Sequence, residues 1–271
     1  MFDRWIMVDW SGGSDTGPRP RRDAIWLCEG RNGITSQPEY LRNRSLAQEK
    51  LRTLIEDALI NGDRLALGFD FPFGYPRGFC EAVTGSTDPF LLWHWFFERV
   101  EDTPKMNNRF DLAGSLNKKF GDGLGPFWGN GLKRDIDGLP RNRRAYRNPF
   151  PERRVVETLA KGSFTCWHLS GAGAVGSQVI MGLPVLQGLR RDFPGQIAVW
   201  PFQELDRPIA FFEIWPSLRL GKEPPSIIRD AWQVREVARV WSQRDTHAAE
   251  FSVESAEEGW ILGVPQERKA A

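Results

Sequence analysis

Residues 6–13 read Ile6-Met7-Val8-Asp9-Trp10-Ser11-Gly12-Gly13, a short apolar run that meets a carboxylate, a hydroxyl and two glycines. The apolar residues predict a strand over 4–9, and the glycines predict a turn directly after it. A strand that ends on Asp9 fits two interpretations. The acid either caps a turn or does chemistry at the edge of a sheet.

Two later apolar runs repeat this pattern. Residues 64–70 (RLALGFD) end on Asp70, and residues 211–215 (FFEIW) carry Glu213, with proline soon after each acid. We also expect strands at 22–28 and 197–202. Apolar periodicity predicts five helices, over 46–61, 90–100, 171–191, 230–241 and 246–257. Strands that interleave with helices predict an open α/β sheet, in which ligands bind beyond the carboxyl ends of the strands.

The chain has 271 residues, of which 41% are hydrophobic and 26% charged, so it can bury a full core as one domain over 1–271. From about 80 to 165 the periodicity gives way to Gly, Pro, Arg and Asn with aromatic residues. We interpret that part as a large insertion, irregular and partly helical. The three cysteines lack CxxC spacing, which argues against a disulfide framework or a structural zinc site and predicts a cytoplasmic protein. No apolar stretch is long enough to span a membrane.

Three strand-end acids form a possible shared site. Asp9, Asp70 and Glu213 would converge at one sheet edge, where their mutual repulsion favours a bound cation. Carboxylates without histidine or thiolate support suit Mg²⁺ or Mn²⁺, which can serve phosphoryl transfer. A fourth acid, Asp245, begins the stretch 245–249 (DTHAA), where it fits either a helix N-cap or this site.

Four stretches together resemble the ribonuclease H-like superfamily and, within it, the domain-of-unknown-function 429 family. They are IMVDWSGG (6–13), ALGFDFPFG (66–74), FFEIWPSL (211–218) and DTHAA (245–249). The resemblance covers most of the chain outside about 80–165. It implies a mixed sheet flanked by helices and a divalent metal held by Asp9, Asp70, Glu213 and Asp245. It also implies a nuclease or phosphohydrolase.

Two positions depart from the family's pattern. Ala248 stands where related resolvases often carry a second acid, and Trp10-Ser11 follows Asp9 where the pattern Asp-x-Gly is commoner.

Two other functions stay open. Ser11, Gly12 and Gly13 would also suit the phosphate loop of a kinase-like or ATPase-like nucleotide-binding protein. The acids could instead be turn caps in a binding module without catalysis.

The segment 105–154 is strongly basic, with twelve Lys or Arg against five Asp or Glu. Its cations alternate with aromatic residues, a pattern that fits nucleic acid or a nucleotide, with Lys133 and Arg134 as phosphate contacts. Solvated loops anchored by their aromatic residues would give the same pattern.

The stretch 171–176 (GAGAVG) precedes a helix without the strand that a dinucleotide fingerprint needs. A glycine-rich helix start could still bind phosphate through free N–H groups, helped by Ser170, Ser177 and Gln178.

Overall fold

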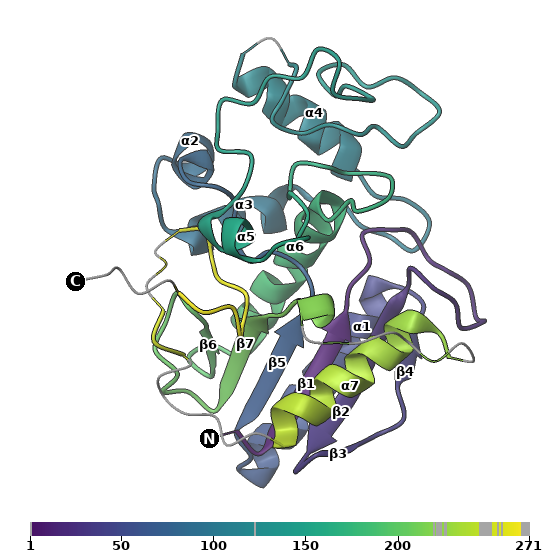
Figure 1. Ribbon diagram of the computed structural model, residues 1–271, viewed down its shortest axis with the longest axis vertical. Coiled ribbons are helices and arrows are strands. Elements are labelled where there is room, and N and C mark those ends of the chain that lie inside the picture. The colour runs from purple at the N-terminus through teal and green to yellow at the C-terminus, as the bar shows by residue number, and fades with distance from the viewer. Residues whose placement is uncertain are drawn as a thin grey trace.

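A computed structural model describes residues 2–121, 123–218, 220, 224, 227–243, 251–253, 255 and 257–266 of the chain. It confirms a mixed α/β fold with a helical middle segment (Figure 1). The strands are β1 (Arg4–Asp9), β2 (Ile25–Arg31), β3 (Ile34–Thr35), β4 (Glu39–Leu41), β5 (Leu65–Phe69), β6 (Ile197–Val199) and β7 (Ile209–Glu213). The helices are α1 (Arg44–Asn61), α2 (Phe79–Thr84), α3 (Pro89–Arg99), α4 (Arg109–Lys119), α5 (Val155–Leu159), α6 (Gly176–Asp192), the 3-10 helix η1 (Pro216–Leu218) and α7 (Arg229–Gln243).

The sheet has the strand order β3-β2-β1-β5-β7-β6, and β4 also pairs with β2. β1 is antiparallel to β2 and parallel to β5, which in turn is parallel to β7. β6 is parallel to β7. The carboxyl ends of β1, β5 and β7 therefore lie at one edge of the sheet (Figure 1).

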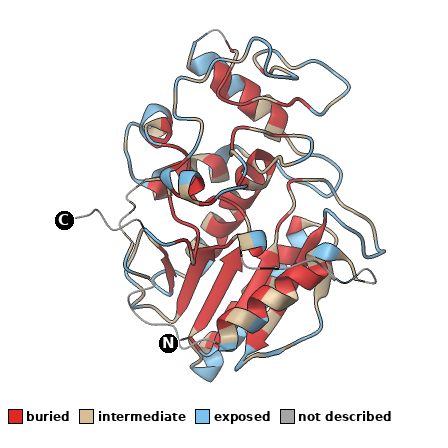
Figure 2. Ribbon diagram, viewed as in Figure 1, coloured by how far each residue is buried: buried red, intermediate tan, exposed pale blue. Residues whose placement is uncertain are grey.

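Helices cover both faces of this sheet. Val8 and Phe69 belong to a core shared with α1, α3 and α6, on what we call the α6 face. Met7 and Phe212 belong to a second core shared with α7, on the α7 face. In Figure 1, α7 lies in front of β1 and β2, and α1 lies behind them. Because both faces are packed, the central strands are buried along their length, except that Asp9 at the end of β1 is half-buried (Figure 2).

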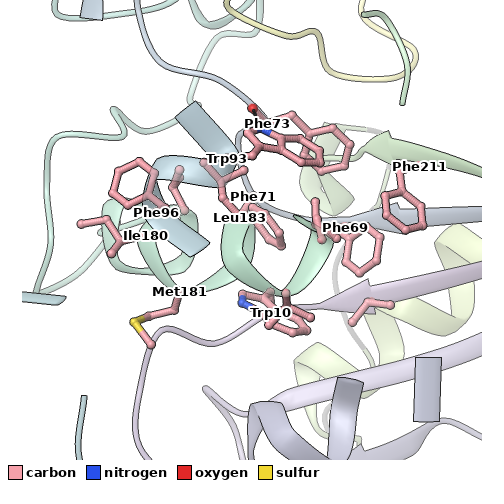
Figure 3. Packing of buried hydrophobic residues seen from close by; sticks show 14 of the residues in the cluster. Trp10, Phe69, Phe71, Phe73, Trp93, Phe96, Ile180, Met181, Leu183 and Phe211 are labelled. Carbon is pink, nitrogen blue, oxygen red and sulfur yellow. Dashed lines mark hydrogen bonds between the residues drawn. The ribbon is translucent and has the colours of Figure 1, made fainter. Parts of the chain in front are cut away.

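The core of the α6 face is aromatic and includes part of the middle segment (Figure 3). The indole N–H of Trp93 in α3 donates to the main-chain oxygen of Phe73 at 2.7 Å, and the two rings meet edge to face at 5.6 Å. Trp10 and Phe71 pack in the same cluster. α3 is thus part of the main core. α4 lies beyond the strand ends (Figure 1) and adds Phe110, Ala113 and Leu116 to the same core.

Some predicted boundaries differ from the structure. β2 begins at Ile25 rather than 22, since Asp23 takes a left-handed φ of 56° that a strand does not accept. β6 ends at Val199, before a cis peptide bond joins Trp200 to Pro201. The helix predicted over 246–257 lies largely outside the described residues. Within the described ranges, no helix is long and apolar enough to cross a membrane.

Candidate functional site

Parallel pairing of β1 and β5 brings two acids side by side. Val8 is in register with Phe69, so Asp9 and Asp70 are the next residues along their neighbouring chains. The main-chain N–H of Asp70 donates to Val8 O at 3.2 Å, and the N–H of Trp10 donates to Asp70 Oδ1 at 2.6 Å. These bonds continue the contact past the end of the ladder and fix one oxygen of the Asp70 carboxylate.

Burial and mutual repulsion make this carboxylate pair hard to ionise. Burial raises the pKa of Asp9 well above its ordinary value, and the charges of Asp70 and Asp230 raise it further. Burial also raises the pKa of Asp70, to about 7, although the Trp10 N–H partly offsets this effect. Asp9 and Asp70 also hydrogen-bond each other, so the pair retains a proton near neutral pH. Both residues keep intermediate exposure, so solvent reaches the pair.

A third acid, Asp230, approaches the pair from the first turn of α7. Its Oδ2 accepts a 2.7 Å hydrogen bond from the main-chain N–H of Asp23. Burial and the neighbouring Asp23 charge raise the pKa of Asp230. Asp230 was not among the predicted site residues. The signal that could have found it is an acid at the start of an amphipathic helix that follows the last strand.

The structure does not bring Glu213 together with Asp9 and Asp70. Glu213 is in register with Phe69, one residue before Asp70, and neighbouring registered residues point to the same face of a sheet. It therefore points to the α6 face, whereas the alternation of β1 places Asp9 on the α7 face with Met7.

Glu213 has partners of its own. Arg154 Nη2 lies 2.6 Å from its Oε1, and the Phe73 N–H donates to its Oε2 at 3.1 Å. Arg154 also pairs with Glu157 at 2.8 Å, and all three charged side chains are almost fully buried. This network ties the loop after β5 to α5, and it leaves Glu213 without free oxygens for a cation beside Asp9.

The loop predicted to bind phosphate is held inside the protein. Arg44 Nη1 donates to the main-chain oxygens of Ser11, at 2.8 Å, and of Gly13, at 2.5 Å. Gly12 packs on α6, because a Cβ added to it would lie 2.6 Å from the Cβ of Ser177. Gly12 thus allows a close contact between the loop and α6.

The remaining predicted residues lie elsewhere. Arg134 pairs with Asp111 of α4 at 2.6 Å, and Arg141 Nη2 donates to Lys133 O at 3.0 Å. Among the described residues, no hydrogen bond or ion pair links Lys133 or Arg134 to the carboxylate pair. Asp245 lies outside the described residues.

Within the described part of the chain, no group of three or more His, Cys, Asp or Glu side chains is arranged to hold a metal ion. The candidate site is therefore the pair Asp9 and Asp70, with Asp230 as an electrostatic neighbour. No protein-family model, curated protein or solved structure matches the chain.

Proposed function

We propose that the protein is a divalent-metal-dependent hydrolase of phosphate esters, a nuclease or phosphohydrolase, with Asp9 and Asp70 as its metal ligands. The observation that carries this proposal is the contact between two acids at the carboxyl ends of adjacent parallel strands. A ribonuclease H-like fold is part of the proposal. It is supported by the antiparallel β1–β2 pair, the parallel β1–β5 pair and a last helix that brings Asp230 to the strand ends.

The carboxylate pair fits a divalent cation in its chemistry. Two acids whose pKa values are raised by burial and repulsion gain most from a positive charge between them. Their oxygens are the ligands that Mg²⁺ and Mn²⁺ prefer. A bound ion would supply a Lewis acid that stabilises charge on the phosphoryl oxygens.

The protein's own groups act on protons and on orientation. The Trp10 N–H holds Asp70 Oδ1, which orients that carboxylate toward Asp9. Burial raises the pKa of Asp70 to about 7 in the metal-free site, so a cation that binds there at neutral pH would displace the proton that the pair shares. Asp230 is fixed by the N–H of Asp23 and adds negative charge beside the pair. This charge would strengthen the attraction for a cation.

The other functions have less support. Arg44 binds the main-chain oxygens of the Ser11–Gly13 loop, and the loop packs against α6. These contacts do not favour a nucleotide-binding kinase-like or ATPase-like protein. Nucleic acid as the partner of the 105–154 segment stays a proposal. Several cations of that segment are paired with acids of the same segment, as Lys118 is with Asp137 at 2.8 Å.

Manganese binding tests the proposal. Calorimetry at pH 7.5 should show Mn²⁺ binding to the wild type, and Asp9→Asn should weaken it more than about tenfold. Mn²⁺-dependent hydrolysis of bis(p-nitrophenyl) phosphate should be lost in the same variant. Asp137→Asn removes an exposed acid and serves as the matched control. Absence of binding by the folded wild type at millimolar Mn²⁺ would overturn the proposal and favour a binding module without catalysis.

A further inference from the structure

A second charged cluster lies on the other side of the Ser11–Gly13 loop, where α4 and α6 begin. Arg109, the first residue of α4, donates through Nε to Ser177 Oγ at 2.9 Å and through Nη1 to Asn107 Oδ1. Both partners are neutral. Among the described residues, no carboxylate lies within ion-pair distance of Arg109, although burial and the Arg44 charge lower its pKa to about 10.

The acids nearest to Arg109 are engaged by other arginines. Asp102 accepts two 2.6 Å hydrogen bonds from Arg44, whose remaining Nη1 is used by the Ser11–Gly13 loop. Asp111, in the first turn of α4, pairs with Arg134. Asp102 is thus bonded to Arg44 and acts on Arg109 only through its charge, so these two guanidinium groups and one carboxylate carry a net positive charge.

Asn107 supplies a second, independent observation. Its Nδ2 is buried and has no hydrogen-bond partner within the described part of the chain. Rotating the amide would not help, because its NH₂ group would then face the Arg109 guanidinium. Leaving a buried donor without an acceptor costs free energy. The Asn107 Nδ2 group therefore needs an acceptor that the described part of the chain does not supply.

The N-terminus of α6 adds to the positive charge of this cluster. α6 begins at Gly176 with no side-chain cap and no acid in its first turn, and its Ser177 hydroxyl already donates to Leu169 O at 2.6 Å. The N-terminus of a helix carries partial positive charge and favours anions. Arg109 Nη2 makes no hydrogen bond to any described residue, whereas Nη1 of the same guanidinium holds the Asn107 amide through Oδ1.

We propose that Arg109 and Asn107 form an oxyanion site for a phosphate group at the start of α6. Arg109 Nη2 and Asn107 Nδ2 would donate to the anion, and its charge would compensate the Arg44–Arg109 pair. The site is separate from the metal proposal, because Arg109 contacts the α6 side of the sheet whereas Asp9 faces the α7 side. Either proposal can fail alone.

Inorganic phosphate is the probe, in thermal unfolding and calorimetry without divalent metal. Phosphate should raise the midpoint of the wild type above that in chloride at equal ionic strength. Arg109→Gln should weaken phosphate binding by about tenfold or more, since charge-assisted hydrogen bonds are lost. Lys105→Gln, an exposed cation of the same segment, should respond as the wild type does.

Asn107→Asp keeps the test decisive if Arg109→Gln does not fold. The new carboxylate would pair with Arg109 and remove the unpartnered Nδ2, so the variant should unfold at a higher temperature than the wild type without phosphate and lose the phosphate response. A larger rise in the unfolding midpoint with adenosine monophosphate than with phosphate would identify a phosphate ester as the ligand. Equal rises would identify the free anion. A phosphate response unchanged in Asn107→Asp, or none in the wild type, would overturn the proposal.

Discussion

The main-chain N–H of Trp10 donates a 2.6 Å hydrogen bond to Oδ1 of Asp70. The residue after the first acid thus holds the second acid, while the Trp10 ring turns away into the aromatic core (Figure 3). A bulky residue after Asp9 therefore does not obstruct the carboxylate pair. Its main-chain N–H fixes the Asp70 carboxylate, and two of the predictions below concern the pair and its neighbour Asp230.

Replacing Asp70 by Asn should change how stability depends on pH. A raised pKa means that the folded protein holds its proton more tightly than the unfolded chain does. The contribution of Asp70 to stability is therefore highest at low pH and falls as pH rises from about 4, the unfolded value, through about 7. Between pH 5 and 7.5 the free energy of unfolding of the wild type should fall by on the order of 2 kcal/mol because of this pair, after discounting for solvent screening. That of Asp70→Asn should fall much less. Urea unfolding at both pH values measures the difference. Parallel pH profiles for the two proteins would contradict it.

Asp230→Asn should weaken Mn²⁺ binding several-fold, since Asp230 contributes negative charge beside Asp9 and Asp70. The amide keeps an oxygen that accepts the Asp23 N–H, so the α7 start should stay in place. Calorimetry compares this variant with Glu213→Gln, which should keep the wild-type affinity if it folds. The reverse order of affinities would mean that Glu213, not Asp230, belongs with the pair.

Arg154→Met should be strongly destabilising. It leaves Glu213 and Glu157 buried without their shared cation, a change that costs about 3–5 kcal/mol. The exposed pair of Lys118 and Asp137 offers a control, because Lys118→Met should cost less than about 1 kcal/mol. Denaturant unfolding measures both variants. A cost for Arg154→Met as small as that of the control would show that the buried network contributes little.

Gly12→Ala should destabilise the protein by about 1–3 kcal/mol, because the new Cβ would lie 2.6 Å from the main chain and Cβ of Ser177. Gly13→Ala is the neighbouring control, with its nearest atom, Ser11 Oγ, at 3.3 Å. Thermal unfolding of the two variants should separate them clearly. Equal midpoints would mean that the loop moves away from α6 at little cost.

Much of the local structure could be predicted from the sequence. Apolar runs marked β1, β5 and β7, and an acid at or next to the end of each was visible. The helix predicted from 46 begins at Arg44, after Asn43, whose side chain caps it by accepting from the Leu46 N–H at 3.0 Å. Contacts between distant segments, such as Arg154 with Glu213, leave no periodic signal and could not be predicted.

The sequence alone determined that strands of this chain end in carboxylates and that strands alternate with helices. Only the tertiary structure decided which acids meet. Strands packed on both faces are apolar along their length. They show no alternation of polar and apolar residues that would indicate which face of the sheet each side chain points to. A shift of one residue in register reverses every side chain. Because Glu213 lies beside Phe69 rather than Asp70, it points to the α6 face and pairs with Arg154, while Asp9 and Asp70 meet near α7.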